Sequence, residues 1–289
     1  MLWGFSPFAA RDGPLLVIKD LGTLTGEVLL FGGPYSNFQA TMTLMDWADR
    51  ADIPPDSRIC TGDLVAYCAD AVAVLNIVRA RGGPVVAGNC EIQLAQTAVD
   101  CGCGFAADSA CSVLAKDWYA YANRVVGADD RAFMAGLPDW VVFSHSGKRY
   151  AVIHGGAFEV SKFLWPTSQD TELLCEINAI RADLGVIDGV ICGHSGIAFS
   201  RHLDGVQWIN AGVIGMPPHD GHSSTWFAVL GHAGVRFERL EYDHNAASAA
   251  MVAVGLTQGY HLALTSGYWP SEDILPLALR RKNQSRASG

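Results

Sequence analysis

The chain has 289 residues, of which 50% are hydrophobic and 17% charged, so it has ample material for a core and is not disordered in composition. Its net charge of −9 opposes broad binding to a nucleic acid polymer, because that affinity comes mainly from cation–phosphate contacts. No apolar run reaches the roughly 18 residues that span a bilayer. The first residues also lack the pattern of a signal peptide. We therefore expect a soluble, cytoplasmic protein with no membrane partner.

The first part of the chain alternates short apolar strands with amphipathic helices. We expect an N-terminal extension over residues 1–26, with a strand at Leu15–Ile18. The strands expected next are Glu27–Phe31, Arg58–Thr61 and Val85–Ala87. Between them the helical spacing predicts one helix after Asn37, which can cap it, and a second over Ala71–Arg81. This alternation with short links favours a parallel sheet covered by helices.

The second part of the chain begins with a loop rich in Gly and Cys over residues 100–111 and then changes from helices to hairpins. Helices are expected at Cys111–Val126, Asp129–Gly136 and Asp170–Leu184, and strands at Val141–His145, Tyr150–Ile153 and Gly189–Cys192. Two further hairpins should turn at Asp204-Gly205 and Ala233-Gly234. Neither a repeat nor a linker is apparent, so residues 27–275 are predicted to form a single domain, followed by a polar tail over 276–289.

Four of the predicted strands end in a small residue next to a polar side chain. The four pairs are Gly62-Asp63, Gly88-Asn89, His154-Gly155 and Gly193-His194. Each residue alone could be structural, since Asp and Asn often cap the next helix or turn. Together, a carboxylate, an amide oxygen and two imidazoles make a mixed site suited to Mn, Fe or Zn.

The eight cysteines are expected to be mostly reduced thiols. Cys101, Cys103 and Cys111 lie close enough in sequence to suggest a zinc clip. Their spacing is not that of a paired Cys-x-x-Cys site, and no fourth ligand is apparent, so buried or inert thiols are favoured.

The order and spacing of these motifs resemble the calcineurin-like metallophosphoesterase superfamily, especially its compact bacterial phosphodiesterase and diadenosine-tetraphosphatase-like branch. The resemblance runs from about Glu27 to Tyr242. Gly62–Asp70 is similar to the family's Gly-Asp block, Gly88–Glu91 to its Gly-Asn-His-Glu/Asp block, and Asn210–Pro217 to its Asn-Pro-Gly-Ser-Val-Gly segment. The resemblance implies an α/β fold in four layers, an α/β/β/α sandwich of two mixed sheets flanked by helices.

The resemblance also implies which metal ligands are present and which are missing. Members of the family usually hold two ions, and the positions of three ligands of the first ion are here occupied by Gly33, Tyr35 and Gly196. The second ion's ligands are all kept, as Asp63, Asn89, His154 and His194. The loss is confined to one ion's own ligands, which favours a single divalent ion (Mn, Fe or Zn) rather than two.

Several residues near these motifs are further candidates for the site. Cys90 stands where the family has a His that contacts substrate phosphate, so with Asp63 it is a candidate catalytic residue, although it could merely fill a vacated space. Contacts to substrate or to a second ion could come from other side chains, each of which could equally be structural. These are Tyr35, Asn37, Tyr67, His219 and His222.

Two functions remain open at the level of sequence. One is a metal-dependent phosphoesterase that hydrolyses phosphomonoesters or phosphodiesters of a small substrate, such as a nucleotide. The other is a catalytically inactive relative that binds a nucleotide, another phosphorylated ligand or a protein partner in the same cleft. Neither reading excludes a homo-oligomer.

Overall fold

The computed structural model describes residues 16–106 and 109–281, and its strands form two mixed sheets. One sheet has six strands in the order β1-β4-β5-β6-β8-β7, and the other has four in the order β10-β9-β2-β3. The six are β1 (Ile18–Leu24), β4 (Trp140–His145), β5 (Lys148–Val152), β6 (Gly189–Cys192), β7 (Phe199–Leu203) and β8 (Val206–Asn210). The four are β2 (Val28–Phe31), β3 (Arg58–Cys60), β9 (Thr225–Gly231) and β10 (Gly234–Leu240).

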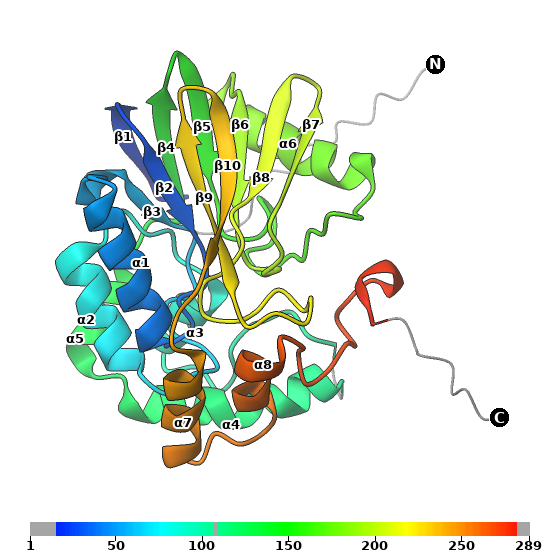
Figure 1. Cartoon of the computed structure of the whole chain (residues 1–289). Coiled ribbons are helices and arrows are strands. Elements are labelled where there is room, and N and C mark those ends of the chain that lie inside the picture. The colour runs from blue at the N-terminus through cyan, green and yellow to red at the C-terminus, as the bar shows by residue number, and fades with distance from the viewer. Residues whose placement is uncertain (1–15, 107–108, 282–289) are drawn as a thin grey trace.

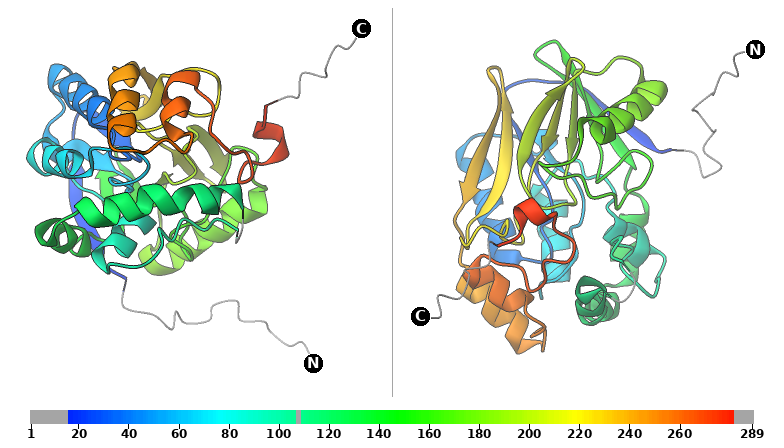
Figure 2. Two further views of the ribbon diagram at one scale, coloured as in Figure 1. Left: turned by 90° about the horizontal axis from the view of Figure 1, so that it is seen from below. Right: turned by 90° about the vertical axis from the view of Figure 1, so that its right-hand side faces the viewer.

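Helices cover the outer faces of both sheets (Figures 1 and 2). The helix α6 (Asp170–Leu184) packs on the six-stranded sheet, and α1 (Phe38–Arg50) and α2 (Ala71–Arg81) pack beside the four-stranded one. The remaining helices are α3 (Asn89–Ala95), α4 (Ala110–Val125), α5 (Ala128–Ala135), α7 (His244–Ala253) and α8 (Tyr260–Ser266), with short 3-10 turns at Pro55–Ser57 and Leu277–Leu279. The predicted four-layer sandwich of two mixed sheets is therefore confirmed.

Strand periodicity explains why the layers form. In β2, Val28 and Leu30 point into the core between the sheets, whereas Leu29 and Phe31 point toward the helices. In β4, Val141 likewise faces the other sheet. Both faces of these strands are apolar because each is covered, which is why they appear in sequence as continuous apolar runs.

The structure differs from the sequence-based expectation in several elements. The strand predicted at Val85–Ala87 is reduced to a single bridge between Val85 and Cys60. The strand predicted at Leu15–Ile18 begins only at Ile18, and Leu15 lies outside the described residues. The strand found there, β1, pairs in parallel with β4. The division of the chain into residues 1–26, 27–275 and 276–289 stays a prediction. Within the described ranges, no helix is long and apolar enough to cross a membrane.

Candidate metal centre

The four polar side chains predicted at strand ends meet where the strands of both sheets end. Asp63 follows β3, His154 follows β5 and His194 follows β6, so three separate strands deliver them to one place. Asn89 is the first residue of α3. All four are buried, with between 1% and 7% of their surface exposed. The strands β5 and β6 are parallel neighbours in the six-stranded sheet and end at the same edge, and β3 of the other sheet ends beside them.

Ligand atoms of Asp63, His154 and His194 lie within 4.8 Å of one another. His154 Nε2 is 3.3 Å from Asp63 Oδ2 and 3.0 Å from His194 Nδ1. It also lies 3.1 Å from Asn89 Oδ1, so the fourth predicted residue belongs to the same group.

Hydrogen bonds around the group decide which atoms carry lone pairs. His154 Nδ1 is 2.6 Å from the carbonyl oxygen of Thr61, so this nitrogen carries a proton and the Nε2 of the neutral ring carries a lone pair. Asn89 Nδ2 donates to the carbonyl oxygen of Cys101 at 2.8 Å, which turns its Oδ1 toward the histidine. Asp63 Oδ2, Asn89 Oδ1 and His154 Nε2 thus lie close together, and His194 Nδ1 is 3.0 Å from His154 Nε2. A carboxylate, an amide oxygen and two imidazoles suit a divalent ion, so these residues could hold one.

The pKa values of the three titratable residues are set by burial and by their contacts with one another. Burial lowers the pKa of His154, but the charge and hydrogen bond of Asp63 outweigh it, and the net pKa is raised. Burial favours the neutral form of Asp63, yet His154 and His194 overcome this effect and its pKa is lowered. His194 behaves differently, because burial dominates and its pKa is lowered. The buried carboxylate is therefore held in its charged form.

Glu91, in the last position of the Gly88–Glu91 motif, fixes the loop that carries Asp63. Its carboxylate accepts hydrogen bonds from the backbone N–H groups of Asp63 (2.7 Å), Leu64 (2.7 Å) and Gly88 (3.0 Å). Burial and the nearby Asp63 charge raise its pKa to about 7.

Two glycines of the motifs are required by these close approaches. A Cβ on Gly88 would lie 2.4 Å from Asp63 Oδ1, and one on Gly62 would lie 2.8 Å from His154 Nδ1. Gly62 also has a positive φ of 99°, which side chains rarely adopt. The Gly-Asp and Gly-Asn patterns therefore have a steric cause.

At Gly33, one of the positions expected to lack a ligand of the first ion, other side chains fill the neighbouring space. A Cβ on Gly33 would lie 2.6 Å from Tyr35 Cζ and 2.7 Å from Val213 Cγ1. The Tyr35 ring is buried and packs edge-on against Tyr67, with ring centroids 4.8 Å apart. Aromatic and aliphatic atoms thus occupy the space beside Gly33, where a ligand side chain would start.

The other predicted contacts have different surroundings. Asn37 caps α1 by accepting from Ala40 N–H, and its amide donates to the carbonyl oxygen of Gly215, so it is engaged structurally. His219 is buried away from the cluster and bonds to Glu272 and to Trp269 N–H. The side chain of His222 is exposed.

Cys90 lies beside the cluster but is 1% exposed. Its backbone N–H donates to Asp63 Oδ1 at 3.3 Å. Burial and the Asp63 charge raise the pKa of the thiol well above its usual value, so at neutral pH it carries its proton.

The expectation of reduced thiols is wrong for two cysteines. Cys101 and Cys103 form a disulfide, whereas Cys111 is free and buried, so the three do not form a zinc clip. The Cys101 carbonyl and Cys103 Sγ both contact the side-chain nitrogen of Asn89. A two-residue separation gives no sequence signal for such a link, and its role beside Asn89 depends on the tertiary structure.

Comparisons with known proteins identify the fold. A metallophosphoesterase from Sphaerobacter thermophilus is 18% identical, with a TM-score of 0.66 over 84% of this chain and 100% of that one. A hypothetical protein from Pyrococcus horikoshii OT3 is 15% identical, with a TM-score of 0.67 over 83% of this chain and 98% of that one. No family model matches the sequence, and no curated protein matches it. The chain thus has the metallophosphoesterase fold, as the resemblance implied.

Proposed function

We propose that the protein is a metal-dependent phosphoesterase with a single divalent ion, held by Asp63, Asn89, His154 and His194. The observation that carries the proposal is the convergence of buried acceptor atoms around His154 Nε2. The packing of Tyr35 and Val213 against Gly33 supports one ion rather than two, because it leaves no room for a ligand side chain at position 33.

The chain's own residues would organise the reaction in defined ways. The Thr61 carbonyl holds His154 in the tautomer whose Nε2 faces the ion, and Glu91 fixes the backbone of Asp63. When bound, the ion supplies Lewis-acid chemistry, withdrawing charge from a phosphoryl oxygen and acidifying water. Cys90 is buried and stays protonated, so in this proposal its contribution is the backbone N–H that it donates to Asp63 Oδ1.

The proposal is tested by metal content and turnover together. After incubation with Mn²⁺ and desalting, we expect one ion per chain and Mn²⁺-dependent hydrolysis of bis(p-nitrophenyl) phosphate. His154→Ala should lose both, whereas His202→Ala is the matched control, since His202 is exposed on β7. Folded protein that retains only trace metal, or equal turnover in His154→Ala, would overturn the proposal.

The alternative function is a binding protein without turnover. It is favoured by the pocket beside His194, whose lining includes neither Lys nor Arg to neutralise a phosphate. Metal-dependent hydrolysis that His154→Ala abolishes and His202→Ala retains would eliminate it. Binding of inorganic phosphate without hydrolysis of either monoesters or diesters would support it.

A further inference from the structure

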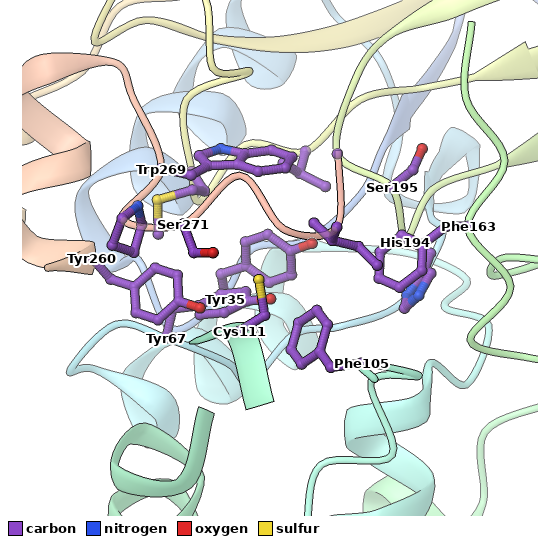
Figure 3. Close-up of a pocket in the computed structure, with 15 residues that line it drawn as sticks. Tyr35, Tyr67, Phe105, Cys111, Phe163, His194, Ser195, Tyr260, Trp269 and Ser271 are labelled. Atoms are coloured by element: carbon purple, nitrogen blue, oxygen red, sulfur yellow. The ribbon is translucent and has the colours of Figure 1, made fainter. Parts of the chain in front are cut away.

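A narrow pocket opens beside the candidate metal centre, and His194 belongs to both (Figure 3). Aromatic side chains dominate its lining. They are Tyr35, Tyr67, Phe105, Phe163, Tyr260 and Trp269. Trp269 lies on one side of the space, across from Tyr67 and Phe105. A substrate held at the centre would therefore extend one of its groups among these rings.

The rings are held in place by one another. Tyr67 lies 4.8 Å from Tyr35 and 4.6 Å from Tyr260, measured between ring centroids, and Phe163 lies 4.3 Å from His194. The two separations between tyrosines fall within the range in which aromatic pairs attract one another, about 4.5–7 Å, and the Phe163–His194 separation falls just below it. A planar guest would join an existing cluster of rings.

The wall formed by Trp269 is also fixed. Its backbone N–H donates to His219 Nδ1 at 2.9 Å, and its indole N–H donates to the carbonyl oxygen of Pro217 at 2.6 Å. His219 is held in turn by Glu272, 2.9 Å away. These bonds give His219 a role at the pocket, as a positioning residue for Trp269.

The polarity of the pocket selects for an uncharged guest. Among the lining residues that the structure describes, none is Lys, Arg, Asp or Glu. Within the described part of the chain, the hydroxyl groups of Tyr35, Tyr67 and Tyr260 have no hydrogen-bond partner, so they are free to bind a polar edge of a ligand. Burial raises the pKa of Tyr35 and Tyr67 well above the usual value, which keeps both neutral.

The volume of the pocket limits which part of a substrate can enter it. The free volume is about 50 Å³, far below the roughly 300–1,000 Å³ of pockets that enclose whole ligands, so one small, flat group fits.

We infer that this aromatic pocket binds an uncharged, planar aromatic group of a phosphate ester whose phosphate lies at the metal centre. The inference rests on the proposed function for the position of the phosphate. It assigns substrate selection to Tyr67 and Trp269, which touch the aromatic group and not the phosphate.

The test is calorimetry of the Mn²⁺-loaded protein with three phosphonates, which share a headgroup and are not hydrolysed. Phenylphosphonate should bind at least about tenfold more tightly than methylphosphonate, and more tightly than cyclohexylphosphonate, because only the phenyl ring is flat and aromatic. Trp269→Leu should lose most of this preference. Phe158→Leu is the matched control, because Phe158 is 59% exposed and does not line the pocket.

Each outcome separates this inference from the proposed function. Equal binding of phenylphosphonate and methylphosphonate, equal binding of the cyclohexyl compound, or an unchanged preference in folded Trp269→Leu overturns the aromatic pocket. Preference for the phenyl ring without hydrolysis of any ester supports the pocket and overturns catalysis. Metal-dependent hydrolysis with no preference for the ring overturns the pocket alone.

Discussion

Replacing Gly33 tests the conclusion that side-chain packing has closed the first metal position. Gly33 has a φ of 39°, and the three atoms nearest to a new Cβ are two from Tyr35 and one from Val213, all at 2.6–2.7 Å. Overpacking typically costs about 1–3 kcal/mol, and a side chain at positive φ costs about 1–2 kcal/mol. We therefore expect Gly33→Ala to lower the free energy of unfolding by about 2–5 kcal/mol.

Two comparisons separate the packing cost from the backbone cost, and urea unfolding measures both. Gly147→Ala should cost only about 1–2 kcal/mol, because Gly147 has a φ of 76° but nothing within 4 Å of its Cβ. In a Tyr35→Leu background, which removes the ring atoms, Gly33→Ala should cost about 1–2 kcal/mol less than in the wild type. An equal cost in both backgrounds, or a cost no greater than that of Gly147→Ala, would refute the reasoning.

Three further predictions concern the surroundings of the centre. Because the pKa of His154 is raised above 6.5, a metal ion must displace its proton, and Mn²⁺ affinity should fall about tenfold per pH unit below that pKa in calorimetric titrations. Reduction of the disulfide, or Cys103→Ser, should weaken Mn²⁺ binding about tenfold by releasing Asn89; unchanged affinity would contradict this. Asn37→Ala should lower the free energy of unfolding in urea by about 2 kcal/mol, because it removes a helix cap and buried hydrogen bonds. A decrease below about 0.5 kcal/mol would contradict this prediction.

The sequence by itself determined the elements and the ends of the strands. The predicted helices over residues 71–81 and 170–184 coincide with α2 and α6, because helical spacing and flanking Gly residues are local signals. The same locality placed Asp63, His154 and His194 at strand ends. Strand ends from both sheets then meet, so that ligand atoms of the three residues lie within 4.8 Å of one another. The mixed sheets and four layers came from the family resemblance, since the alternation of strands and helices predicted only a parallel sheet.

Only the tertiary structure decided what surrounds that group of residues. Trp269 reaches the pocket from a segment whose sequence has no motif, and His219, a candidate for substrate or metal contact, instead positions Trp269. The ring of Tyr35 fills the space beside Gly33 through contacts that neither residue's local pattern reveals. The periodicity of apolar residues indicates which face of a helix or strand is buried. It does not indicate which side chains meet across a cleft, because those contacts depend on how segments far apart in sequence pack together.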